Sequence, residues 1–121
     1  MATARYIVRN VDEAIRFYVD ILGFELQQQF GSAMAIVAYD GMSLWLAGPA
    51  ASASKPMPDG RKPEPGGWNR IVLTRDDLDS LVARLRGGSV SFRNEIISGP
   101  GGRQILCEDP SGNPIELFEP A

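Results

Sequence analysis

The sequence contains no histidine, and this absence excludes more chemistry than any other feature of its composition. Histidine is the usual general base near neutral pH and the commonest metal ligand in proteins. A Ser-His-Asp triad, a Cys-His pair and a histidine-bearing zinc site are therefore all excluded. The only cysteine, Cys107, cannot form an internal disulfide, so a reducing cytoplasm is expected. It lies in an apolar run that predicts a buried strand residue, with a reactive thiol as the alternative.

Long apolar runs and clusters of basic residues are also missing. No apolar run approaches the roughly 18 residues needed to cross a bilayer, and the N-terminus lacks the apolar core of a signal peptide. The net charge is −3, the pI is about 4.9, and arginine and lysine are scattered. Neither nucleic acid nor a membrane is therefore an expected partner. A length of 121 residues with 44% hydrophobic residues suits one compact domain or two small modules.

The first half of the chain predicts one strand, one helix and three further strands. The helix spans residues 11–22, because its apolar residues recur at helical spacing. Asn10 and Glu13 form a capping box at its start, and Gly23 ends it. Asp40-Gly41 is a strong signal for a hairpin turn between the last two strands. The four predicted strands are 4–8, 24–29, 33–39 and 43–47.

The second half repeats this order after a segment rich in proline, glycine, alanine and serine. A helix capped by Asp77 runs to about residue 86, and strands are predicted at 68–74, 90–95, 103–108 and 114–119. The chain is therefore divided into a first βαβββ module (1–47), a linker (48–67) and a second βαβββ module (68–121). One helix covers only one face of each sheet, so the two modules are expected to pair around a shared cleft.

Three segments resemble the vicinal-oxygen-chelate superfamily, which contains the glyoxalases, the bleomycin resistance proteins and a group of dioxygenases. They are residues 10–24, which include Asn10-Val11-Asp12 and Leu22-Gly23-Phe24, then residues 76–79, and residues 108–118 with the run Asp-Pro-Ser-Gly-Asn-Pro-Ile-Glu-Leu. The resemblance implies an α+β fold in which two βαβββ modules form an eight-stranded open curved sheet around a cleft. The helices then cover the outer face.

The metal ligands of this family do not match the sequence. Metal-binding members place one ligand on the first and one on the last strand of each module, and the resemblance puts Thr3, Trp45, Arg70 and Glu116 at these positions. Only the Glu116 carboxylate ligates metals well, because an indole offers an N–H donor and a guanidinium is a fixed cation. A lone carboxylate facing a guanidinium does not hold a divalent ion against water. No metal or cofactor is therefore expected, and the sequence is more similar to the metal-free, bleomycin-resistance-like branch.

Strand alternation predicts which side chains face the cleft. Leu44 and Leu46 would face the helix of the first module, and Ile115 and Leu117 that of the second. The opposite face mixes aromatic, charged and small side chains, which suits an aromatic organic ligand. Trp45 could instead fill space between the modules, and Arg70 and Glu116 could form a purely structural ion pair. The expected ligand-binding residues are Trp45, Arg70, Glu116, Trp68, Thr3, Phe118 and Ser43.

The resulting hypothesis is metal-independent binding and sequestration of an aromatic small molecule or natural product, as in drug-resistance members of the family. The resemblance also implies a homodimer, in which the modules pair within one chain or are swapped between two. The alternative is a metal-independent isomerase, lyase or tailoring enzyme of natural-product metabolism, with Glu116 as base and Arg70 stabilising an oxyanion. A metal-dependent lyase, isomerase or dioxygenase is the third hypothesis. The adjacent guanidinium weakens Glu116 as a base, which favours binding over catalysis.

Overall fold

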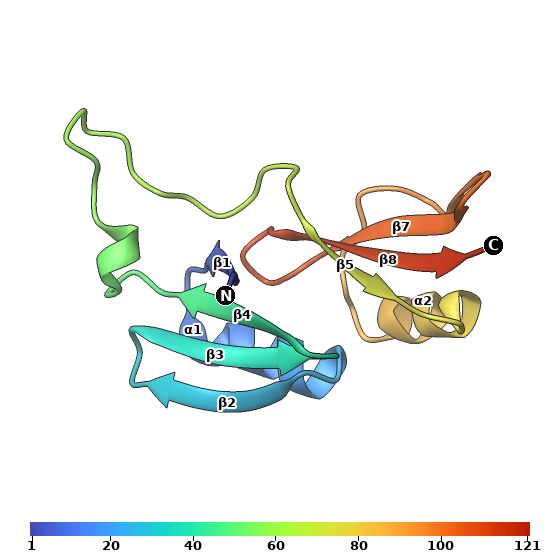
Figure 1. Cartoon of the computed structure of the whole chain (residues 1–121), viewed down its shortest axis with the longest axis horizontal. Helices are drawn as coiled ribbons and strands as arrows, with labels where there is room; N and C mark the ends of the chain where they lie inside the picture. The colour runs from blue at the N-terminus through green and yellow to red at the C-terminus, as the bar shows by residue number, and fades with distance from the viewer. The chain divides into compact units, whose positions relative to one another are not determined.

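The eight strands form two separate four-stranded sheets, one in each half of the chain (Figure 1). They are seen in a computed structural model that describes all residues from 1 to 121. The strand orders, β1-β4-β3-β2 and β5-β8-β7-β6, are the same in the two halves. In each sheet the first and last strands of the module pair in parallel, and the other pairs are antiparallel. The predicted α+β class and the βαβββ repeat are confirmed.

The first module follows the predicted order closely. Asn10 begins the helix by accepting a hydrogen bond from the Glu13 N–H at 2.8 Å, and Gly23, with φ of 87°, follows its end. Asp40 and Gly41 both have positive φ, as the predicted hairpin turn requires. The elements are β1 (Ala4–Ile7), α1 (Val11–Ile15) continued by a π-helical segment (Arg16–Ile21), β2 (Glu25–Phe30), β3 (Met34–Tyr39) and β4 (Met42–Ala47).

The second module departs from the prediction at its edge strand. The continuous strand predicted at 90–95 is wrong: only Phe92 forms a bridge there, to Cys107. The ladder breaks because the Leu106 N–H donates to the side-chain oxygen of Asn94 instead of to a backbone carbonyl. A short strand forms later instead. The elements are β5 (Ile71–Thr74), α2 (Leu78–Gly87), β6 (Ile97–Gly99), β7 (Gly102–Glu108) and β8 (Pro114–Pro120).

The prediction that the Asp77 side chain caps α2 is also wrong. Asp77 occupies the position before the helix, but both of its carboxylate oxygens accept hydrogen bonds from Arg75, at 2.9 and 2.8 Å. A bidentate pair with a guanidinium is stronger than a hydrogen bond to one backbone amide. The Leu78 N–H donates instead to the Glu119 carboxylate at 3.1 Å.

The core lies between each sheet and its helix. Side chains of alternating strand residues are buried on the face toward the helix, among them Val37, Leu44 and Leu46 in the first module and Ile115 and Leu117 in the second. Cys107 belongs to this set, and burial raises the pKa of its thiol to about 12. The cysteine is therefore a packing residue whose thiolate is disfavoured. None of the helices has the length and apolar character needed to cross a membrane.

By its contacts, the chain divides into two compact units. The first contains Met1–Gly66 together with the turn Pro110–Asn113, and the second contains Gly67–Asp109 and Pro114–Ala121. Within the first unit, the buried Asn113 side chain donates to the Ile7 carbonyl and accepts from the Gly66 N–H, both at 2.8 Å. One side chain therefore satisfies two backbone groups that are far apart in the sequence.

Replacing Asn113 with alanine should lower the free energy of unfolding by about 1–3 kcal/mol, because both backbone groups lose their partner. Urea unfolding followed by circular dichroism measures the change. Asn69→Ala is the matched control, since Asn69 is exposed. Equal stability of the two variants would show that water replaces the Asn113 amide without cost.

Stability at acid pH should depend on Arg103. Its guanidinium hydrogen-bonds Asp79 and Glu119, and these bonds hold the pKa of each carboxyl below its ordinary value. The stabilisation is thus complete above the ordinary carboxyl range, about pH 4, and is lost as pH falls through the lowered values. In Arg103→Met the free energy of unfolding should fall less steeply on acidification. Arg16→Met, at an exposed arginine, should keep the wild-type slope.

Candidate functional site

In the first unit, Trp45 lies on the sheet face that points away from α1. Arg5 on β1 is the register partner of Trp45 on β4, so the two side chains share this face. The Arg5 guanidinium lies over the indole, 5.1 Å from the ring centroid. Ser43 lies on the same face of β4, half-buried, whereas Thr3 is exposed and precedes β1. Arg5, Ser43 and Trp45 are called the Trp45 surface below.

Arg5 therefore lies beside Trp45, whereas Thr3, a residue predicted for this site, precedes β1. A cation over an indole face is attracted by the ring quadrupole. An aromatic ligand that stacks on this face of Trp45 has to displace the guanidinium or lie against it.

In the second unit, Arg70 and Glu116 form the ion pair that the sequence predicted. The Arg70 Nε and Nη2 donate to the same carboxylate oxygen, Glu116 Oε1, at 3.0 and 2.8 Å. Glu116 is only 8% exposed, on the face of β8 that points away from α2. Arg70 Nη1 also donates to the Trp68 carbonyl at 3.3 Å, and Phe118 lies two residues further along the same face. Trp68, Arg70, Glu116 and Phe118 are called the Arg70 surface below.

Two residues beside this surface, Arg93 and Glu108, were not predicted from the sequence. The Arg93 guanidinium lies 4.7 Å from the Trp68 ring centroid, and its Nε donates to Glu108 at 2.7 Å. Its Nη1 donates to the Gly67 carbonyl at 2.6 Å. Glu108 was predictable, because the turn after it sets the register Glu108↔Pro114 and places it on the face of Glu116. Arg93 was not, because the strand predicted at 90–95 is replaced by an irregular segment with a single bridge at Phe92.

Each unit thus presents one tryptophan with a guanidinium stacked against it. The two rings differ in access: Trp68 is 68% exposed, whereas Trp45 is partly buried. The structure makes Trp68 the more accessible ring, with Arg93 on one of its faces.

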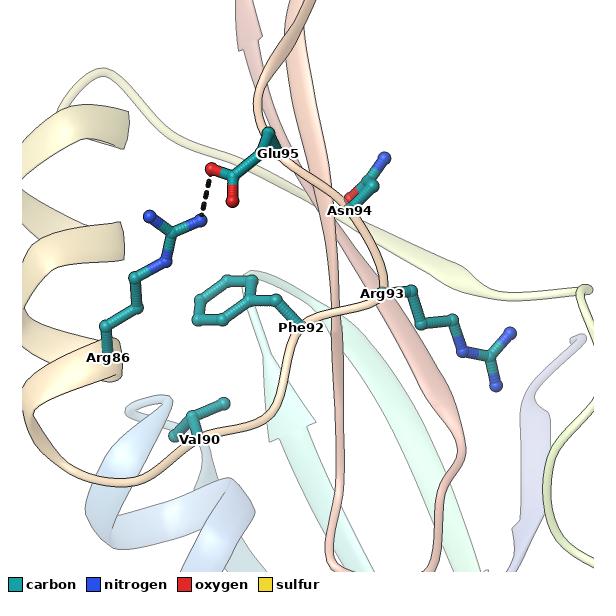
Figure 2. Close-up of a pocket in the computed structure, with 6 residues that line it drawn as sticks. All are labelled: Arg86, Val90, Phe92, Arg93, Asn94 and Glu95. Carbon is teal, nitrogen blue, oxygen red and sulfur yellow. Dashed lines mark hydrogen bonds and ion pairs between the residues drawn. The ribbon is translucent and has the colours of Figure 1, made fainter.

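A separate cavity of about 430 Å³ lies between the C-terminal end of α2 and the segment leading to β6 (Figure 2). The Arg86 guanidinium lies 5.2 Å from the Phe92 ring centroid and pairs with Glu95 at 2.7 Å. Figure 2 shows the Arg93 side chain directed away from Arg86 and Phe92. None of the predicted ligand-binding residues lines this cavity. Its exposed guanidinium is neutralised by Glu95, so it offers no uncompensated charge to a ligand.

The residues at the family's metal positions do not fit a metal ion. The one carboxylate, Glu116, is already engaged by Arg70, and the indole of Trp45 is covered by Arg5. No group of three or more histidine, cysteine, aspartate or glutamate side chains is placed to ligate a metal. The side chains at these positions suit contacts with organic groups, because a guanidinium can donate hydrogen bonds, an indole can stack and a carboxylate can accept.

Comparison with known proteins places the whole arrangement in a family. The family model for the glyoxalase/bleomycin resistance protein/dioxygenase superfamily matches residues 1–117. The chain belongs to this superfamily. It is 30% identical over 113 residues to the uncharacterized protein YaeR of Escherichia coli, a match that covers 85% of this chain and 82% of the relative.

Solved structures of other superfamily members have the same fold. TnmS3, an antibiotic-binding protein from Streptomyces sp. CB03234, is 29% identical with a TM-score of 0.69, covering 100% of this chain and 97% of its own. A lactoylglutathione lyase from Agrobacterium tumefaciens is 19% identical with a TM-score of 0.77, covering 98% and 92%. Because that identity is low, the second likeness concerns the fold alone.

Replacing Arg70 with alanine should destabilise the protein, because it leaves Glu116 on the sheet without a cation. A loss of about 1–3 kcal/mol in the free energy of unfolding is expected, below the value for a fully buried pair because Arg70 retains contact with water. Chemical unfolding measures it. The double variant Arg70→Met/Glu116→Leu should recover much of the loss. If Arg70→Ala matched wild type, the carboxylate would be solvated well enough to need no partner.

Proposed function

We propose that this chain binds and sequesters an aromatic small molecule, of the kind found among antibiotics and other natural products, without a metal ion. The observation that carries the proposal is the Arg70–Glu116 pair, because it places an organic ion pair at two of the family's metal-ligand positions. The stacked pairs Arg5–Trp45 and Arg93–Trp68 support it, since indoles and guanidiniums both stack on planar molecules. The likeness to an antibiotic-binding protein at 29% identity adds support.

The ligand we propose is planar and carries hydrogen-bond acceptors. A planar ring can lie against Trp68 or Trp45, and a carbonyl or phenolate oxygen can accept from a guanidinium of Arg5, Arg70 or Arg93. Ser43 and Phe118 would extend the contact, and Thr3 would border it. Binding such a ligand would cost little side-chain entropy, because the rings and guanidinium planes that would contact it are already held against one another.

We further propose that the protein acts as a homodimer. Both units expose apolar side chains on strands, such as Phe30 on β2 and Val72 on β5. Singly exposed apolar side chains are ordinary on protein surfaces, so the support for a homodimer is the resemblance to the superfamily.

One observation favours a second candidate function, which is catalytic. Both hydrogen bonds from Arg70 reach Glu116 Oε1, so Glu116 Oε2 is left to accept a proton from a ligand. In that case Glu116 would be a general base and Arg70 would stabilise an oxyanion, as in a metal-independent isomerase, lyase or tailoring enzyme. Recovering the ligand chemically unchanged after prolonged incubation favours sequestration, and recovering a product favours catalysis.

Single-tryptophan variants test the proposal, because each surface carries one of the chain's two tryptophans. Trp45→Phe leaves Trp68 as the reporter, and Trp68→Phe leaves Trp45. Titration with a panel of aromatic natural products should quench the fluorescence of both variants saturably and with similar affinity.

Truncation of the rings should then weaken binding. Trp68→Ala and Trp45→Ala should each lose about 1–3 kcal/mol of binding free energy, the usual value of an aromatic stacking contact. Phe92→Ala is the control, since Phe92 lines the separate cavity in Figure 2. Unchanged affinity in both tryptophan variants would remove these surfaces from the site.

A further inference from the structure

The proline-rich segment between β4 and β5 encloses a second cavity, within the first unit and of about 390 Å³. One wall is the end of β1 and the residues after it, from Ile7 to Arg9. The other wall is formed by this segment, whose prolines at 49, 56, 63 and 65 all line the cavity. Neither tryptophan lines it, and it shares no residue with the Trp45 and Arg70 surfaces, although Ile7 lies on the same sheet face as Arg5.

The charge around this cavity is all of one sign. The chain has only two lysines, Lys55 and Lys62, and both line the cavity together with Arg9. No aspartate or glutamate is among the lining residues. None of the seven ion pairs in the structure involves these three cations. In a protein of net charge −3, three unneutralised cations around one hollow form an isolated positive site.

The carboxylates near this cavity either have other partners or do not line it. Asp59 is paired with Arg61 at 2.8 Å, and Asp12 accepts a hydrogen bond from Gln29 at 2.8 Å. Glu64 is exposed in the same segment and does not line the cavity. An incoming anion would therefore meet the lysines without having to displace a carboxylate from either.

The two lysines are held near each other by the backbone of the segment. The Met57 N–H donates to the Arg61 carbonyl at 2.7 Å, and the Gly60 N–H donates to the Met57 carbonyl at 2.9 Å. These bonds close a turn, and Lys55 precedes the turn while Lys62 follows it. At the base, the Ser54 hydroxyl donates to the Gly48 carbonyl at 2.7 Å. Prolines beside both lysines restrict the backbone further, so little backbone entropy is lost when a ligand binds.

We propose that this cavity binds a small organic anion, with a carboxylate or phosphate group between Lys55, Lys62 and Arg9 and an apolar body against Ile7 and the proline rings. Ammonium and guanidinium groups are the donors that recognise such anions. Pyrrolidine rings and an isoleucine offer no polar partner, so they select an apolar body. The site adds a ligand class to the aromatic binding proposed above and does not depend on it.

The test uses benzoate and phenyl phosphate as probes, with benzyl alcohol as the uncharged control and inorganic phosphate as the anion without an apolar body. Backbone amide shifts of the full chain, followed by NMR, locate and quantify binding. Saturable shifts should appear at residues 7–9 and 55–63 with both aromatic anions. Benzyl alcohol should give none, inorganic phosphate should bind at least about tenfold more weakly than phenyl phosphate, and added salt should weaken binding.

Variants separate charge from shape. Lys55→Gln and Lys62→Gln should each weaken benzoate binding several-fold, and the double variant by about tenfold or more. Lys55→Arg/Lys62→Arg should retain binding, and Arg16→Gln, at an exposed arginine outside the cavity, should not change it.

Three results would overturn the proposal: no saturable shift with either aromatic anion, undiminished binding in the double glutamine variant, or shifts confined to the Trp45 and Arg70 surfaces. Inorganic phosphate binding as tightly as phenyl phosphate would refute the apolar part. Loss of this binding leaves the tryptophan quenching experiment untouched, so the two proposals fail separately.

Discussion

The Arg70–Glu116 ion pair is the interaction that determines the chemistry of the second unit's sheet on the face away from α2. Glu116 points from β8 to the side away from α2, where it is 8% exposed, and a carboxylate so far removed from water requires a partner. Arg70 supplies two hydrogen bonds to one oxygen and a third to the Trp68 carbonyl. The pair therefore ties the residues before β5 to β8 and helps to place Trp68. Arg70 thereby engages the one carboxylate at the family's metal-ligand positions that a metal ion would need.

The alternation of strand residues turns this local pairing into a surface. On β8, Ile115 and Leu117 enter the core, while Glu116 and Phe118 lie on the other face. On β4, Leu44 and Leu46 enter the core and Trp45 lies opposite. Each sheet thus uses one face for stability and leaves the other to aromatic and charged groups. The superfamily fold supplies this division, and the side chains on the face away from the helices determine the chemistry.

Much of this was predictable from the sequence because it depends on local rules. The capping box at Asn10, the turn at Asp40-Gly41 and the repeat follow from residue types at fixed spacing. The Arg70–Glu116 pair was predictable from the family resemblance, which aligned both residues with metal-ligand positions. The absence of a strand at 90–95 was not predictable, because it depends on a side-chain oxygen of Asn94 that replaces a backbone acceptor. Nor were the partners of the tryptophans, since Arg93 and Trp68 are far apart in the sequence and meet through tertiary structure alone.

The most direct test of the central claim, that this member of the superfamily binds its ligand through organic groups alone, is a metal analysis combined with a binding titration. The protein is purified with and without a strong chelator, its metal content is determined by mass spectrometry, and both preparations are titrated with the aromatic compound that gives the strongest quenching. We expect metal far below one ion per chain and the same affinity in both preparations. Stoichiometric zinc, iron, nickel or manganese, lost to the chelator together with ligand binding or turnover, would contradict the claim.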